Sequence, residues 1–239
     1  MKWYRGPEGD QRIWYEDDEI ERIMGGELAR AGLAPTITSP VTDLERFIES
    51  HLKADLDQYT DLPVGVLGLT QFVLGKRPAV SISAELTDSA DEGSPGLAGR
   101  WRATLAHEAA HVVLHRYLFD PELATLDLFG TTMPHEAPSG GLMRCLKRDI
   151  GPVRGVDWRE VQANRGMAAL LMPRVTFRRI ASQRIAAESL TDLRSGSPSA
   201  ANLATMMAES FSVSKQAASI RLETLGLVTA TDVAYLPGL

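Results

Sequence analysis

The chain has 239 residues, of which 44% are hydrophobic and 23% charged, and its formal net charge is −6. This composition is typical of a soluble globular protein of one or two domains, and the negative charge excludes non-specific coating of nucleic acid. The single cysteine excludes an intrachain disulfide, and no apolar run is long enough to cross a bilayer. Because the first residues lack the apolar run of a signal peptide, we expect a cytoplasmic protein without a membrane partner.

Two segments near the N-terminus predict helices. Residues 16–32 carry apolar side chains at helical spacing around two central glycines, which indicates an amphipathic helix. Thr42 follows soon after Pro40 and is expected to cap a short helix. The apolar residues of this short helix that we expect to face inward are Leu44, Phe47 and Ile48.

The middle of the chain predicts a strand pair followed by a buried helix. Residues 64–72 and 79–86 are rich in β-branched residues or alternate in polarity, and the link between them contains glycine and proline. Residues 88–99 have the composition of a loop. Residues 101–119 contain no glycine or proline and are apolar around most of a helical circumference, so we expect a buried helix there.

The remaining chain is predicted to be mainly helical. Residues 120–157 contain four prolines and five glycines and are expected to be irregular. Helices are predicted at 158–172 and 175–190, followed by a short linker at 195–200. Residues 202–225 indicate two further helices.

The predicted buried helix contains an HExxH motif formed by His107, Glu108 and His111. Residues four apart project from one helix face, so both imidazoles can bind one cation, and Glu108 can accept a proton from water that the cation activates. Zinc suits imidazole and carboxylate ligands and leaves a fourth position for water. The motif also occurs by chance in buried helices, so by itself it leaves a purely structural role open.

A catalytic zinc needs a third protein ligand. His115 lies about 6 Å beyond His111 along the helix axis, so we expect it to pack or to orient another residue rather than to bind. Glu160 shares a later, mostly apolar helix face with Asn164, where a carboxylate is costly unless it is paired or bound to metal. Asn164 can orient a ligand histidine. A solvated helix start explains Glu160 equally well, so the spacing leaves both interpretations open.

Between the two motifs lie further side chains that are able to approach a metal. We expect them to be ordinary loop or small buried residues instead, although a thiolate is a strong zinc ligand. They are His135, Glu136, Cys145 and Asp149.

The segments LAHEAAHVVLH (105–115) and EVQANRGMAALLMP (160–173) together resemble the ImmA/IrrE family of metallo-endopeptidases. The resemblance covers about residues 64–173, although two alanines stand where the family's motif often has leucine and glycine. It implies a gluzincin-like site with His107 and His111 as ligands, Glu108 as general base and Glu160 as third ligand. It also implies a protein substrate, expected to be a helix-turn-helix transcriptional repressor.

The C-terminal segment resembles a helix-turn-helix module, with a tight turn at residues 212–213 and a capping serine. Basic residues outnumber acidic ones between residues 174 and 225, which permits contact with DNA. The side chains able to contact DNA or a partner are Ser214, Lys215, Gln216, Ser219 and Arg221. We place packing or partner binding slightly ahead of DNA readout.

We therefore expect an α+β fold, in which a small β-sheet packs with the HExxH helix in a zincin-like domain. This domain is predicted to span residues 1–190, and a helical helix-turn-helix-like domain to span 191–239. We expect a zinc-dependent endopeptidase with one Zn²⁺ ion, manganese being the alternative metal. The other interpretation is a non-catalytic metal-binding regulatory protein or a DNA-binding protein.

Overall fold

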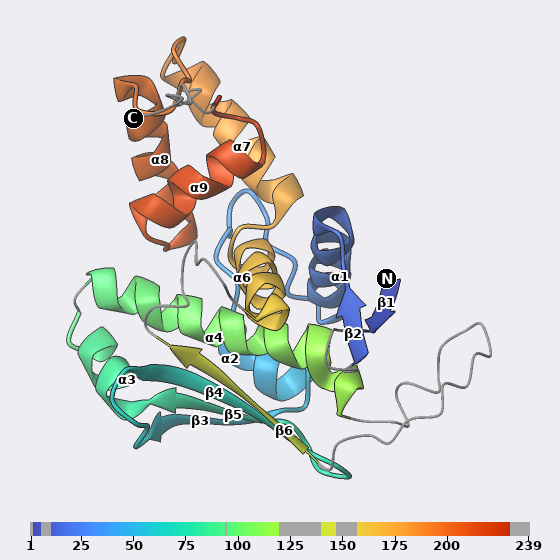
Figure 1. The fold of residues 1–239 in the computed structure, drawn as a ribbon. Helices are drawn as coiled ribbons and strands as arrows, with labels where there is room; N and C mark the ends of the chain where they lie inside the picture. The colour runs from blue at the N-terminus through green and yellow to red at the C-terminus, as the bar shows by residue number, and fades with distance from the viewer. Residues whose placement is uncertain (1, 6–10, 94, 120–139, 147–156, 230–239) are drawn as a thin grey trace, which may run out of the picture. The chain divides into compact units, whose positions relative to one another are not determined.

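The computed structural model describes residues 2–5, 11–93, 95–119, 140–146 and 157–229, and it shows a mixed α+β protein (Figure 1). The chain divides into two compact units, one formed by residues 1–34 with 42–171 and the other by residues 35–41 with 172–239. The division lies earlier than the expected boundary at residue 190. None of the described helices has the length and apolar composition that crossing a bilayer requires.

The first unit holds the sheet and the helices that pack on it. In chain order its elements are β1 (Lys2–Arg5), β2 (Gln11–Trp14), α1 (Asp17–Arg30), α2 (Leu44–Arg46), the π-helix η1 (Phe47–His51), β3 (Asp55–Thr60), β4 (Val66–Val73), β5 (Ala79–Ser83), α3 (Ala84–Asp91), α4 (Pro95–His115), the 3-10 turn η2 (Arg116–Leu118), β6 (Gly140–Leu146) and α6 (Trp158–Leu171).

The main sheet has four strands in the order β3-β5-β4-β6. β3 pairs parallel to β5, whereas β4 pairs antiparallel to β5 and to β6. The predicted strand pair is confirmed as β4 and β5. The sequence did not predict β3, which is polar and half-exposed, nor β6, which begins with two glycines inside the segment expected to be irregular.

The long helix α4 lies between this sheet and α6 (Figure 1). The expected loop at 88–99 is wrong, because α3 continues to Asp91 and α4 already begins at Pro95. Proline suits a first helical turn, where its missing N–H has no partner to lose. Around the HExxH motif the helix is buried on all sides, as its apolar composition predicts.

The two N-terminal helices occur as predicted, with one correction. α1 buries Ile20, Met24 and Leu28. The short helix begins at Leu44, and the residues predicted to face inward are buried. Its cap is Asp43 rather than Thr42, because the Asp43 carboxylate accepts a hydrogen bond from the Arg46 N–H at 3.0 Å. The Thr42 hydroxyl instead donates to the Leu170 carbonyl at 2.9 Å.

The second unit is helical and contains α7 (Arg174–Ala187), α8 (Pro198–Phe211) and α9 (Lys215–Thr224). α7 belongs to this unit because it packs on α8, with the Phe177 and Phe211 rings 5.2 Å apart. The predicted linker at 195–200 extends too far, because Ser197 caps α8 and the helix begins at Pro198. The two predicted final helices are confirmed, joined through Ser212 in the left-handed region (φ 52°) and through the cap Ser214.

Candidate metal centre

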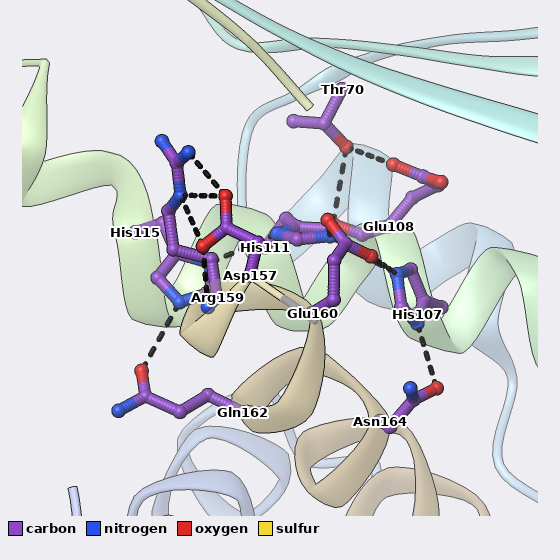
Figure 2. Close-up of polar contacts among 10 residues, drawn as sticks. All are labelled: Thr70, His107, Glu108, His111, His115, Asp157, Arg159, Glu160, Gln162 and Asn164. Atoms are coloured by element: carbon purple, nitrogen blue, oxygen red, sulfur yellow. Dashed lines mark hydrogen bonds and ion pairs between the residues drawn. The ribbon is translucent and has the colours of Figure 1, made fainter. Parts of the chain in front are cut away.

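The three side chains expected to bind metal converge inside the first unit (Figure 2). The Glu160 carboxylate lies 3.1 Å from Nε2 of His107 and 3.4 Å from Nε2 of His111, and the two Nε2 atoms are 3.0 Å apart. Ligands about 2.0–2.1 Å from a tetrahedral zinc are about 3.3 Å from each other. The spacing therefore fits one such ion, and the donor set of two imidazoles and a carboxylate fits its chemistry.

The outer nitrogens of the two ligand histidines have partners that set their tautomers. His107 Nδ1 lies 3.2 Å from the Asn164 amide oxygen, so this nitrogen donates. His115 Nε2 lies 3.2 Å from the Gln162 amide oxygen and donates to it, which leaves His115 Nδ1 as an acceptor. His111 Nδ1, 2.9 Å from that atom, must then donate. Both ligand rings thus present an Nε2 lone pair to the same point, as binding to a cation requires.

Glu108 lies beside this group and is held by strand β4. The Thr70 hydroxyl donates to Glu108 Oε2 at 2.5 Å, on the opposite side of the cluster from Asn164 (Figure 2). Glu108 Oε1 is buried and has no hydrogen-bond partner within the described part of the chain. A Cβ atom on Gly68 would lie only 2.5 Å from Oε1. The glycine therefore leaves the space that this oxygen needs.

The electrostatics of the cluster favour a cation among its ligands. The side chains of His107 and His111 are fully buried, and that of Glu160 is 11% exposed. Burial lowers the pKa of His111 to about 4. Burial also opposes charge on Glu160 and His107. When His107 Nε2 carries a proton instead of a cation, its hydrogen bond to Glu160 outweighs this effect of burial, so the pKa of Glu160 is lowered and that of His107 is raised.

Glu108 has a different electrostatic environment from Glu160. Burial raises the pKa of Glu108 to about 7, against the opposing effects of the His107 charge and the Thr70 hydrogen bond. A carboxyl group that titrates near neutral pH is suited to accept and return a proton. The two glutamates of the cluster thus differ in the way expected for a ligand and a general base.

Close packing of α6 on α4 brings Glu160 to the histidines. A Cβ atom on Gly166 would lie 2.7 Å from both the Ala110 Cβ and the Met24 Cε. Ala110 is itself part of the HExxH motif. Small residues at these two positions therefore let the helices approach closely enough for ligands 53 residues apart in sequence to meet.

Comparisons of the chain with family models, curated proteins and solved structures found no match. The resemblance to the ImmA/IrrE family therefore rests on the two motifs and stays a prediction. The structure independently brings together the four residues that this resemblance assigns, which are His107, Glu108, His111 and Glu160.

The residues predicted to contact DNA or a partner divide into two groups. Ser214, Lys215 and Gln216 are exposed at the start of α9, and Ser219 is half-buried. The prediction for Arg221 is wrong, because its side chain is 4% exposed and donates two hydrogen bonds to the Met172 carbonyl, at 3.0 and 2.8 Å.

The four residues between the two motifs that are able to approach a metal lie outside the described residues or in β6. His135, Glu136 and Asp149 are outside the described residues. Cys145 is part of β6, paired with Gly68 through the backbone. Sequence reasoning missed Thr70 and Gln162, both fully buried. A polar residue on the buried face of β4 is a usable signal for Thr70. Gln162 has no comparable signal, because it lies in a helix that is polar at its start.

Proposed function

We propose that the chain is a zinc-dependent endopeptidase that hydrolyses a peptide bond in a regulatory protein. One observation is the main support for this proposal. Glu108, next in sequence to His107, is buried beside a set of three metal ligands and keeps Oε1 without a hydrogen-bond partner in the described structure. A metal site with only a structural role has no need for such a group.

The proposed chemistry divides the work among residues of the cluster. His107, His111 and Glu160 would hold zinc, which when bound supplies Lewis-acid activation of water and of a substrate carbonyl. Glu108 takes a proton from the attacking water at Oε1, while the Thr70 hydroxyl holds Oε2. Because burial raises its pKa to about 7, Glu108 can then return that proton to the leaving amine.

The substrate expected from the motif resemblance is a helix-turn-helix transcriptional repressor, whose cleavage would release transcription. The second unit supports a regulatory setting, since two helices joined by a short turn present exposed polar residues at the start of α9. Such a pair can bind a protein partner or DNA.

The test is co-incubation with the helix-turn-helix repressor encoded next to this gene, together with metal analysis. We expect one zinc per chain, cleavage of the repressor, and loss of cleavage with a chelator. Glu108→Gln should keep the zinc and lower the cleavage rate by about 10²–10⁴-fold. If the variant binds zinc and cleaves as fast as the wild type, the catalytic proposal is wrong.

The same preparation tests the alternative of a non-catalytic metal-binding regulator or a DNA-binding protein. A regulator of this kind binds zinc but leaves the repressor intact. A DNA-binding protein retards specific genomic fragments, with an affinity that falls steeply as salt is raised. Absence of any shift on such fragments removes the DNA-binding alternative.

A further inference from the structure

The strand that contacts Glu108 is covered on its outer edge by another segment of the same chain. Thr70 and Gly68 of β4 lie against the Glu108 carboxylate. Along one edge of β4, β6 pairs antiparallel, from Val66 opposite Leu146 to Val73 opposite Gly140. β6 also lies against α4 (Figure 1). The other edge of β4 pairs with β5, which β3 holds from its far side, so the edge paired with β6 is the one that an incoming strand could take.

β6 has the features of a strand that can leave the sheet. Among the strands that the structure describes, it is at the edge of the sheet and hydrogen-bonds to β4 alone. Its first two residues are glycines, which weaken a strand because they lose more backbone entropy on pairing and offer no side chain to pack. It belongs to the long segment between α4 and α6, so its departure does not require either ligand-bearing helix to unfold.

An extended peptide recognises a sheet edge through main-chain hydrogen bonds, and those bonds accept many sequences. A peptide paired with β4 in place of β6 would run past Thr70 and Gly68, the two residues of β4 that lie against Glu108. We propose that β6 occupies the place of the substrate, and that an extended segment of the protein substrate pairs with β4 only after β6 is displaced. This inference rests on the proposed endopeptidase function, and it makes β6 an internal block on the site.

The first experiment measures strand exchange without catalysis. Met143→Pro combined with Arg144→Pro removes at least one hydrogen bond to β4, because N–H groups of successive residues point to opposite sides of a strand. The matched control is Met143→Ala with Arg144→Ala, which keeps every N–H group. The probe is a fluorescent peptide of residues 140–146 with serine in place of Cys145, and binding is followed by anisotropy.

We expect the peptide to bind the proline variant about tenfold or more tightly than the wild type or the alanine control, because the open edge is populated more. Equal binding to all three proteins, or no binding to a proline variant that keeps its circular dichroism spectrum and its zinc, overturns the proposal.

A second measurement uses the unaltered chain and does not depend on how the variants fold. Native-state hydrogen exchange should be about a hundredfold or more faster in residues 140–146 than in β3, the other outer strand of the sheet. Equal protection of β6 and β3 against hydrogen exchange overturns the proposal that β6 is displaced. If exchange and peptide binding behave as expected but the repressor is not cleaved, the endopeptidase function fails and the strand exchange stands.

Discussion

The Nδ1 atoms of His111 and His115 lie 2.9 Å apart, one helical turn from each other on α4. Only one of these two nitrogens carries the shared hydrogen, and the acceptor Gln162 on the far side of His115 determines which one. His115 therefore acts on the candidate metal centre through the ring of His111, although it is too far along the helix to be a ligand. This relationship separates His115 from the two histidines of the HExxH motif.

The first prediction compares Glu160→Ala with His115→Ala. Glu160→Ala removes a ligand and should lose zinc almost completely. His115→Ala removes only an orienting partner, so it should largely keep its zinc and weaken the affinity by at most about 10–100-fold. Zinc content after gel filtration and competition with a chelating dye measure both variants. The reverse order of zinc loss contradicts the ligand assignment.

A second prediction concerns the hydroxyl that holds Glu108. Thr70→Val leaves the buried Glu108 Oε2 without its hydrogen-bond donor, so the free energy of unfolding should fall by about 1–3 kcal/mol. Thr70→Ser keeps the hydroxyl and is the control, with a smaller loss. Urea unfolding of the zinc-loaded proteins measures both. An unchanged stability of the valine variant would mean that this hydrogen bond is not made in solution.

The third prediction tests the close approach of α6 to α4. Gly166→Ala forces a Cβ atom to within 2.7 Å of Ala110 and Met24, so it should destabilise the fold by about 1–3 kcal/mol and weaken zinc binding by moving Glu160. Gly25→Ala, in the interior of α1, meets nothing within 4 Å and should stabilise by about 0.5–1 kcal/mol. Thermal unfolding with and without zinc compares them. Similar effects of the two substitutions would argue against tight helix packing.

The last prediction separates a structural arginine from an exposed lysine in α9. Arg221→Ala removes a buried charged donor of two hydrogen bonds to Met172 and should lower the unfolding free energy by about 2–3 kcal/mol. Lys215→Ala, at the exposed start of the helix, should change it by less than about 0.5 kcal/mol. Chemical denaturation measures both. A loss of partner or DNA binding by the lysine variant at unchanged stability would assign a contact to Lys215.

The features that could be predicted from the sequence alone depend on interactions between residues close together in the chain. The spacing of His107 and His111 follows from the period of one helix, and the cap at Ser214 follows from neighbouring residues. The same periodicity excluded His115 as a ligand, because the rise of a helix does not depend on what packs against it. These features needed no knowledge of the rest of the fold.

The features that could not be predicted from the sequence depend on contacts between segments far apart in the chain. The spacing of Glu160 and Asn164 left a solvated helix start and a metal ligand equally open, and only the packing of α6 on α4 placed the carboxylate 3.1 Å from His107. Tertiary packing also decided the hydrogen bond of Thr70 to Glu108, the burial of Arg221, and the pairing of β6 with β4. Residue type and spacing determine which face of an element a side chain occupies, but what that face meets is decided by tertiary packing.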